Sequence, residues 1–342
     1  MHTNADARAL LVCAGGGLGD SLVASVVARA LQRRYRFVDA LTLPGHRETL
    51  ERSPDVDRVY VDDGVPEAEL AAALAARDYS AAIVTWATAR IARILQSARI
   101  PIRVGQARRL YSWRFTRRVT VRSEIGDIAS PWADILLDFA RVLNCDCEDR
   151  APRFVPTDAD LARAAAFLDA FPQCARGFAL VHATNAIATQ REVWPVAGWI
   201  ALVRAIQNRF DVPVILGGSA ADVPIVETIA RESQAISAAG KVDIGAYGAL
   251  ASRAEFFAGI TTGSMHVAAA AGAPTVGIFP FQTDFPERWR PLGARTAIIR
   301  ASYPCRPRER KETCPDYACV RHLDVHRILA AIESLRPVAA RA

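Results

Sequence analysis

The chain has 342 residues, 51% of them apolar, and a formal net charge of +6 that arginine supplies almost alone. It contains no low-complexity tract and no apolar run of 18 residues, which excludes a disordered chain and a membrane-spanning helix. The positive charge favours an anionic partner and leaves three classes open: a phosphate-bearing substrate, an acidic membrane surface or a nucleic acid.

The first residues and the cysteines predict a cytoplasmic protein. The N-terminus is polar and passes directly into a strand-like run, without the basic, apolar and small-residue regions of a signal peptide. Seven cysteines are scattered along the chain, several of them inside apolar runs, which is typical of a reducing compartment.

Short apolar runs alternate with helical periodicity in both halves of the chain. In the first half we predict strands at 8–14, 57–63, 81–85, 101–105 and 117–122, and helices at 20–34, 66–77 and 88–98. In the second half we predict strands at 177–183, 212–218, 256–262 and 273–279, and helices at 195–210, 219–233 and 264–272. Apolar strands that are each followed by a helix form parallel sheets covered on both faces. The sequence therefore predicts an α/β protein with two doubly wound, Rossmann-like domains and a cleft between them.

Prolines place the domain boundary between about 145 and 175. We predict an N-terminal domain at 1–155, a C-terminal domain at 175–322 and a final segment at 323–342. The amphipathic helix at 324–336 in that segment has room to pack back on the N-terminal domain.

A glycine loop, Gly15-Gly16-Gly17-Leu18-Gly19-Asp20, joins the first strand to the first helix. Glycines at a helix N-terminus let backbone N–H groups approach an anion, but Asp20 replaces the last glycine of the dinucleotide fingerprint. This departure argues against a nucleotide-dependent oxidoreductase, a class of enzyme that paired Rossmann-like domains would otherwise suggest. Asp20 has two interpretations, a helix N-cap or a base that accepts a proton from a hydroxyl, and the loop alone favours the cap.

Thr261, Thr262 and Gly263 end another predicted strand, and His266 lies in the first turn of the next helix. Hydroxyls, exposed N–H groups and an imidazole converge there, which predicts a phosphate or diphosphate site. The alternative is a histidine that packs in the core.

Several segments in the same order along the chain resemble glycosyltransferase family 9, the ADP-heptose:lipopolysaccharide heptosyltransferases. They are GGGLGDSLVASVVARALQRRY (15–35), SPDVDRVYVDD (53–63), REVWPVAGWIALVRAI (191–206), VPVILGGSAAD (212–222), TTGSMHVAAAAGAPTVGIFP (261–280), Thr283-Asp284 and RWRPLG (288–293). The resemblance implies a GT-B fold with the acceptor on the N-terminal domain and the nucleotide-sugar donor on the C-terminal domain. It also implies inverting, metal-independent transfer, without a cofactor, of a sugar such as heptose from an ADP-sugar to a lipopolysaccharide-type or other glycan acceptor.

The same resemblance implies roles for particular residues. Asp20 corresponds to the general base, which reverses the preference for a simple cap. The implied donor-binding residues are Thr184, Arg191, Thr261, Thr262, Gly263, Ser264, Met265 and His266. The implied acceptor-binding residues are Gly17, Gly19, Arg108, Arg109 and Arg114.

The segment 103–122 interleaves arginines with Tyr111, Trp113 and Phe115, a pattern that nucleic-acid-binding proteins also show. In a protein resembling this family, an anionic glycolipid at the inner membrane surface fits better, with a solvated loop as the alternative. We therefore expect no nucleic acid as a partner, and a cytoplasmic location that includes peripheral contact with the inner face of the membrane.

The sequence departs from the family's pattern at two positions of the implied donor site. Thr261 stands where the family usually has aspartate, and Glu192 stands where it has lysine, with Arg191 beside it as a substitute cation. These departures keep open a donor-binding but catalytically weak or regulatory protein, a different nucleotide sugar, or a protein acceptor.

Two further motifs have structural explanations that we prefer. Asp55 and Asp57 form a D-x-D pattern at a turn, where surface turn residues are expected. Cys305, Cys314 and Cys319 with His322 do not have a regular zinc-ligand spacing, so packing is the preferred interpretation and no metal site is predicted.

Overall fold

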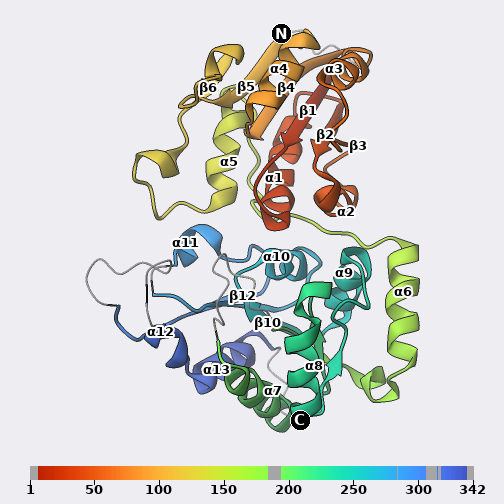
Figure 1. The fold of residues 1–342 in the computed structure, drawn as a ribbon, viewed down its shortest axis with the longest axis vertical. Coiled ribbons are helices and arrows are strands. Elements are labelled where there is room, and N and C mark those ends of the chain that lie inside the picture. Colours follow the sequence, from red (N-terminus) through yellow and green to blue (C-terminus); the bar gives the residue numbers. More distant parts are fainter. Residues whose placement is uncertain (1–6, 184–193, 283, 306–313, 315–316, 337–342) are drawn as a thin grey trace. The chain divides into compact units, whose positions relative to one another are not determined.

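The computed structural model describes residues 7–183, 194–282, 284–305, 314 and 317–336. The chain folds as two compact units, Met1–Val155 and Pro156–Ala342, drawn from red to yellow and from green to blue in Figure 1. None of the helices in the described ranges is long and apolar enough to cross a membrane.

The N-terminal unit is built on one parallel sheet with the strand order β3-β2-β1-β4-β5-β6. The strands are β1 (Arg8–Cys13), β2 (Phe37–Thr42), β3 (Val59–Val61), β4 (Tyr79–Trp86), β5 (Ile102–Gln106) and β6 (Arg117–Val119). The helices are α1 (Leu18–Leu31), α2 (Arg47–Glu51), α3 (Glu67–Ala75), α4 (Ala89–Ser97) and α5 (Trp132–Arg141), with 3₁₀ turns η1 (Pro44–His46), η2 (Ser112–Arg114) and η3 (Arg122–Ile125). Helices α3 and α4 share a buried cluster with Leu10 and Val12 of β1, while α1 and α5 pack against each other outside that cluster.

The C-terminal unit repeats this topology, with the order β12-β11-β10-β7-β8-β9. Its strands are β7 (Ala179–His182), β8 (Val214–Gly217), β9 (Ile236–Ser237), β10 (Phe256–Ile260), β11 (Thr275–Phe279) and β12 (Thr296–Arg300). Its helices are α6 (Asp158–Asp169), α7 (Val196–Phe210), α8 (Val223–Ser233), α9 (Ile244–Arg253), α10 (Gly263–Ala270), α11 (Pro286–Trp289), α12 (Ala318–Arg321) and α13 (Val325–Leu335), with 3₁₀ turns η4 (Pro172–Arg176) and η5 (Ala220–Asp222). Each unit therefore has the strand order of a Rossmann-type sheet.

Every strand and helix that the periodicity predicts overlaps an observed element, but several elements were missed. Strand β2 was not predicted because Asp39 interrupts its apolar run. The structure buries this carboxylate and satisfies it with a 2.6 Å hydrogen bond from the Tyr79 hydroxyl. Helix α6 was not predicted because it lies inside the proline-containing stretch at 145–175, where the sequence indicates the domain boundary.

The C-terminal helix packs on the sheet of its own unit. Helix α13 contacts β11, β12 and α7, and its buried residues Ile328 and Ile332 belong to the core of the C-terminal unit. The apolar face of α13 therefore completes the cluster around its own sheet, and the expectation that the helix also covers the N-terminal domain stays a prediction.

Two other motifs prove to be structural. Asp55 is buried and pairs with Arg29 (2.7 Å), and Asp57 accepts a hydrogen bond from the Val38 N–H (2.6 Å), so Asp55 is not the surface turn residue that we expected. Cys314 and Cys319 are buried in the C-terminal core. Among the described residues, no three His, Cys, Asp or Glu side chains come close enough together to hold a metal ion.

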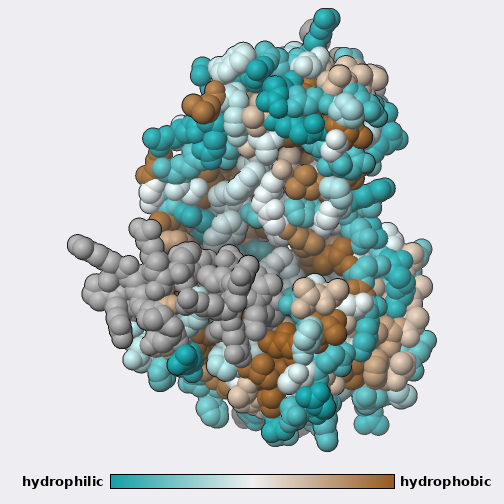
Figure 2. All heavy atoms as spheres, viewed as in Figure 1, coloured by the Kyte–Doolittle hydropathy of each residue, from teal (hydrophilic) through white to brown (hydrophobic). Residues whose placement is uncertain are grey.

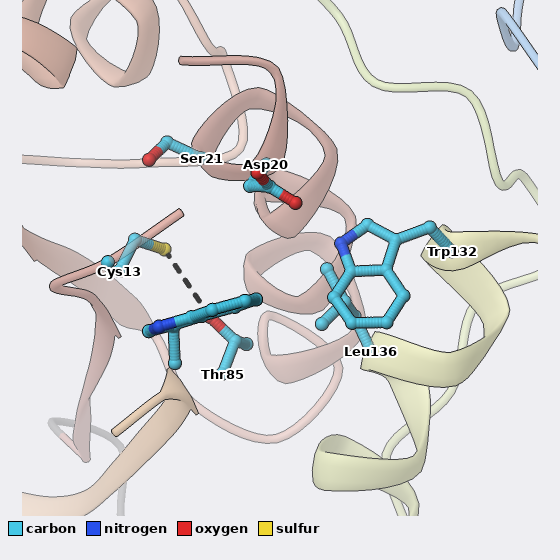
Figure 3. Close-up of a pocket in the computed structure, with 8 residues that line it drawn as sticks. Cys13, Asp20, Ser21, Thr85, Trp132 and Leu136 are labelled. Atoms are coloured by element: carbon cyan, nitrogen blue, oxygen red, sulfur yellow. Dashed lines mark hydrogen bonds between the residues drawn. The ribbon is translucent and has the colours of Figure 1, made fainter. Parts of the chain in front are cut away.

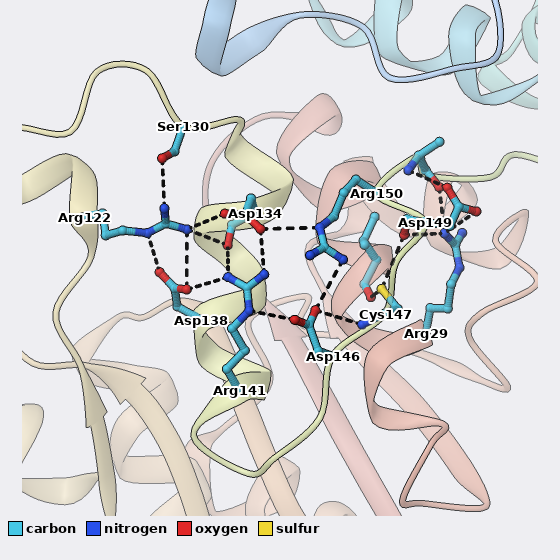
Figure 4. A network of polar contacts seen from close by, with 12 residues as sticks. Arg29, Arg122, Ser130, Asp134, Asp138, Arg141, Asp146, Cys147, Asp149 and Arg150 are labelled. Atoms are coloured by element: carbon cyan, nitrogen blue, oxygen red, sulfur yellow. Dashed lines mark hydrogen bonds and ion pairs between the residues drawn. The ribbon is translucent and has the colours of Figure 1, made fainter.

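A network of arginines and aspartates holds helix α5 in place (Figure 4). Asp134 accepts hydrogen bonds from Arg141 (2.6 Å) and Arg122 (2.8 Å), and Arg150 lies 3.4 Å from the same carboxylate. Arg122 belongs to η3, so the network joins the first turn of α5 to two segments outside the helix. That turn also carries Trp132, which lines the pocket described below.

Replacing Asp134 by asparagine should lower stability in a pH-dependent way. Although burial opposes ionisation, the hydrogen bonds from Arg141 and Arg122 prevail and hold the pKa of Asp134 at about 2. A depressed carboxyl pKa contributes stability above the unfolded-state value near 3.8, and this contribution is lost as the pH falls toward 2. We expect Asp134→Asn to cost about 2 kcal/mol at pH 7 and about half of that at pH 3. Urea unfolding at both pH values measures the difference, and an equal cost at both would contradict this account.

Candidate active site

Each sheet has one topological switch point, where chain connections leave in opposite directions. These points lie between β1 and β4 in the N-terminal unit and between β7 and β10 in the C-terminal unit. In open α/β sheets, ligands bind outside the carboxyl ends of the strands at such points. Asp20 follows β1, and Thr262 follows β10, so each unit places a candidate residue at its own switch point.

The N-terminal switch point carries a small pocket (Figure 3). It is lined by Cys13, Gly15, Asp20, Ser21, Thr85, Trp86, Trp132 and Leu136. These residues come from the ends of β1 and β4, the first turn of α1 and the beginning of α5. The pocket therefore lies within one unit and combines apolar walls with one carboxylate.

Asp20 acts as a cap and also keeps one oxygen available. Its Oδ2 accepts a 2.7 Å hydrogen bond from the Gly17 N–H at the start of α1. Its Oδ1 is buried and accepts no hydrogen bond within the described ranges, although the Trp132 indole points toward the carboxyl group (Figure 3). The two interpretations of Asp20 are thus compatible, because each concerns a different oxygen.

The surroundings of Asp20 make it a stronger base than an exposed aspartate. Burial raises the pKa of Asp20 above its usual range, and the Gly17 hydrogen bond, the Trp132 indole and His46 oppose the rise. His46 is held by Ser21, whose Oγ lies 3.0 Å from His46 Nδ1. A carboxylate with a raised pKa accepts a proton from a hydroxyl more readily.

Trp86 supplies an open aromatic wall beside this carboxylate. Its side chain is 40% exposed at the end of β4, and its ring lies against the glycine turn. A Cβ atom at Gly15 would come within 2.0 Å of the indole Cδ1, so only glycine leaves room for the ring there. An indole face next to a hydrogen-bond acceptor suits a ligand that has both apolar and hydroxyl-bearing sides.

The C-terminal switch point carries an open helix N-terminus. Thr262 is the N-cap of α10, but its hydroxyl makes no capping bond and instead shares a 2.6 Å hydrogen bond with the Ser264 hydroxyl. The N–H groups of Gly263 and Ser264 donate no hydrogen bond to any described residue. Unpaired amides and the helix dipole favour an anion at this position.

Buried aromatic groups lie close to this helix terminus. His266 is buried, its Nδ1 has no hydrogen-bond partner among the described residues, and burial lowers the pKa of its ring to about 4. At the end of β7, His182 packs edge-to-face on Tyr247 at 5.9 Å, and burial lowers the pKa of His182 to about 4 as well. Both imidazoles are therefore neutral at pH 7 and can each donate one hydrogen bond.

The predicted site residues differ in whether the structure places them at the α10 terminus, in the N-terminal pocket or away from both. Thr261, Thr262, Gly263 and Ser264 are partly exposed at the α10 terminus, whereas the Met265 side chain is core, with Sδ against Gly277. Gly17 caps α1, but Gly19 is buried in the first turn and does not line the pocket. Arg108, Arg109 and Arg114 lie on the β5–β6 loop and also do not line the pocket. The predictions for Thr184, Arg191 and Glu192 fall outside the described residues.

Five residues of the two candidate sites were not predicted from the sequence: His46, Trp86, Trp132, His182 and Tyr247. Trp86 and His182 were detectable in principle, since each is at the carboxyl end of a predicted apolar strand, where ligands of α/β proteins bind. The other three come from segments that no strand prediction covers, and only the fold brings them to the sites.

Comparison with known proteins agrees with this fold. The sequence model of glycosyltransferase family 9 (heptosyltransferase) matches residues 68–317. A family 9 glycosyltransferase from Veillonella parvula DSM 2008 has a similar structure, with a TM-score of 0.80 and 16% identity over 97% of both chains. The structure of E. coli ADP-heptose LPS heptosyltransferase II has a TM-score of 0.75 and 19% sequence identity, over 96% of this chain and 98% of that one. The structure of E. coli heptosyltransferase WaaC with ADP has a TM-score of 0.70 and 18% sequence identity, over 96% of this chain and 99% of that one. No match was found among curated protein sequences.

The two Rossmann-type units and the family match define a glycosyltransferase with the GT-B fold. The chain belongs to glycosyltransferase family 9, the heptosyltransferase family. The predicted fold class and enzyme class are thereby confirmed.

Proposed function

We propose that the protein transfers a sugar, heptose in the first instance, from an ADP-sugar to a lipopolysaccharide-type glycan acceptor, with inversion and without a metal ion. The observation that carries the proposal is the pairing of two unlike sites at equivalent switch points. One has a buried carboxylate oxygen in an aromatic pocket, and the other has an open, anion-binding helix terminus. A glycosyl transfer needs both a base and a diphosphate site.

The α10 terminus is the proposed donor site. The free N–H groups of Gly263 and Ser264 bind the diphosphate, and the hydroxyls of Thr261 and Thr262 are placed beside it. WaaC has been solved with ADP and with ADP-2-deoxy-2-fluoro heptose, which supports an ADP-sugar as the donor.

In the proposed reaction, Asp20 Oδ1 takes the proton of an acceptor hydroxyl as its oxygen attacks the anomeric carbon of the donor. The bond from that carbon to the diphosphate oxygen breaks, and ADP leaves with the electron pair. Charge that develops on the diphosphate is stabilised by the α10 amides and dipole, a role that other enzymes give to metal ions. A single displacement of this kind inverts the anomeric centre, through an oxocarbenium-like transition state.

The acceptor sugar is proposed to stack on Trp86 in the N-terminal pocket. Trp86→Ala should raise the acceptor KM about tenfold, because it removes the open indole face, and Trp86→Phe should restore most of the loss. The donor KM should not change. Initial rates with ADP-heptose and a lipopolysaccharide core oligosaccharide measure both constants, and a change confined to the donor KM would refute this placement.

A screen of nucleotide sugars tests the function itself. Calorimetry and turnover assays with ADP-, GDP- and UDP-sugars should show ADP-sugar binding and transfer. Thr261 presents a hydroxyl where the family pattern has a carboxylate, and this supports the alternative of a donor-binding but catalytically weak protein or another nucleotide sugar. Binding without turnover across the panel would favour the first of these alternatives, and a preference for GDP or UDP the second.

A further inference from the structure

The pocket that contains Asp20 brings a carboxylate to its ligand and no cation. Its lining in the described ranges includes no arginine, lysine or histidine. Burial raises the pKa of the Cys13 thiol to about 12, so this lining residue is uncharged at neutral pH. The other members carry no charge: Gly15, Ser21, Thr85, Trp86, Trp132 and Leu136. A sugar in this pocket therefore meets Asp20 without a positive charge from the described lining to offset it.

Arginines in the segments that follow strands of this sheet do not supply the missing cation. Four of them are already paired with carboxylates of the protein, and Arg108 donates to the Glu124 carbonyl (3.4 Å). His46, close to Asp20, is mainly neutral at pH 7, because burial lowers its pKa below the usual value although Asp20 opposes this. The four pairs are Arg47–Glu51, Arg90–Asp62, Arg109–Glu124 and Arg122–Asp134.

A charged sugar would interact unfavourably with this arrangement. The proposed reaction requires Asp20 to be ionised before it accepts a proton, and its Oδ1 is buried, where water screens the charge poorly. A second carboxylate in the pocket would be repelled, since no cation of the lining separates the two. An ammonium group would instead pair with Asp20, but ion pairing lowers the pKa of a carboxylate and weakens it as a base. Both kinds of charge therefore oppose transfer.

Trp86 favours an uncharged sugar ring. On the face shown in Figure 2, hydrophilic residues predominate over the N-terminal unit, and hydrophobic ones are scattered among them. Trp86 differs from such scattered residues because it is 40% exposed and lines the same pocket as the buried carboxylate. An indole face packs on the C–H face of a sugar, while a hydroxyl at the ring edge reaches a hydrogen-bond acceptor. The pocket thus combines the two contacts that a neutral sugar offers.

We propose that the sugar unit that receives the transferred sugar is uncharged, a neutral hexose or heptose, and that sugars bearing a carboxylate are excluded from the Asp20 pocket. This inference rests on the proposed function and adds the chemical class of the accepting unit. It concerns only the unit in the pocket, so charged groups elsewhere on the acceptor are compatible with it. The reaction that prepares the acceptor must accordingly add a neutral sugar to the growing glycan.

Matched sugars that differ at one group test the proposal. Methyl glycosides of glucose, galactose and mannose are compared as the parent alcohol, the uronic acid and the uronamide. Tryptophan fluorescence follows their binding to the full chain at pH 7, and Trp86→Phe shows which part of the signal comes from the pocket. In the configuration that binds best, we expect the alcohol and the amide to bind at least about tenfold more tightly than the acid. The net charge of +6 attracts anions at long range, so this order would reflect the pocket and not the whole protein.

Two variants establish whether Asp20 causes the selectivity. Asp20→Asn should bind the acid and the amide about equally, because it removes the repelling charge and keeps an acceptor for the Gly17 N–H. Asp160→Asn changes a capping carboxylate of α6, outside the pocket, and should keep the wild-type preference. The proposal fails if the wild type binds the acid as tightly as the amide, or if Asp20→Asn retains the preference. It also fails if no sugar of the panel changes the fluorescence of Trp86.

Transfer assays distinguish a failure of this proposal from a failure of the proposed function. With ADP-heptose as the donor, the alcohol and the amide should be glycosylated at least about tenfold faster than the acid. Equal transfer to the acid, or faster transfer to a methyl glucosaminide, would overturn the charge selectivity and leave the glycosyltransferase function intact. A binding preference for the amide without transfer from any nucleotide sugar would contradict the proposed function and still support the selectivity of the pocket.

Discussion

Asp20→Asn is expected to reduce kcat by about a thousandfold while leaving ADP binding unchanged. The amide can still accept the Gly17 hydrogen bond that closes the first turn of α1, so the helix keeps its cap. What the variant loses is the carboxylate oxygen Oδ1 in the aromatic pocket, which we propose as the proton acceptor. Asp20→Ala removes both functions and should also cost about 1 kcal/mol of stability. Transfer assays and calorimetry with ADP separate these effects.

A second capping carboxylate provides a control for Asp20. In α6, Asp160 accepts a 2.8 Å hydrogen bond from the Thr157 N–H, in the same geometry but away from both sites. Asp160→Asn should leave kcat unchanged. If both variants lose activity equally, the effect comes from capping, and Asp20 is not the base.

The pH dependence provides an independent check of Asp20. Because burial raises the pKa of Asp20, ionising this group in the folded protein costs free energy that the unfolded chain does not pay. The wild type should therefore lose stability relative to Asp20→Asn as the pH rises through that raised pKa. Its kcat/KM should rise over the same range. Urea unfolding and rate profiles measure both trends.

Ser264→Asp is expected to weaken ADP binding more than a hundredfold without destabilising the protein. A carboxylate in the first turn of α10 interacts favourably with the helix dipole, by about 0.3–1 kcal/mol. The same charge repels a diphosphate at the free N–H groups of Gly263 and Ser264, and juxtaposed like charges cost several kcal/mol. The substitution therefore separates stability from binding, because the same charge stabilises the helix and weakens ADP binding.

Calorimetric titration with ADP and thermal unfolding measure the two effects of Ser264→Asp. Ser264→Ala loses only the hydroxyl that pairs with Thr262 and should weaken binding less than tenfold. Ala159→Asp places the same charge at the second position of α6 and should leave binding unchanged. Unaltered ADP affinity in Ser264→Asp would remove the donor site from this helix terminus.

The buried histidines near the proposed donor site are neutral at pH 7. His266 has its pKa lowered to about 4 by burial, so its imidazole does not change charge between pH 5 and 8. The backbone amides at the N-terminus of α10 do not titrate, so we expect their attraction for an anion to be independent of pH over this range.

Much of this architecture follows from local sequence patterns. Runs such as RALLVCA and FFAGITT are apolar throughout and are followed by helical periodicity, which is sufficient to predict parallel sheets. Asp20 and Thr262 could be selected because a strand-to-helix junction marks the carboxyl edge of a sheet wherever that strand lies. Both inferences need only the neighbours of a residue along the chain.

The tertiary structure determines which distant side chains contact these residues. Sheet order places β4 beside β1, and this adjacency brings Trp86 against Gly15 and next to Asp20, although Gly15 and Trp86 are 71 positions apart in the sequence. Packing also explains why Asp39 sits in a strand and why α13 covers its own unit, since both depend on distant partners. Periodicity reports which face of an element is buried but not what covers it, because that choice depends on how the elements pack in three dimensions.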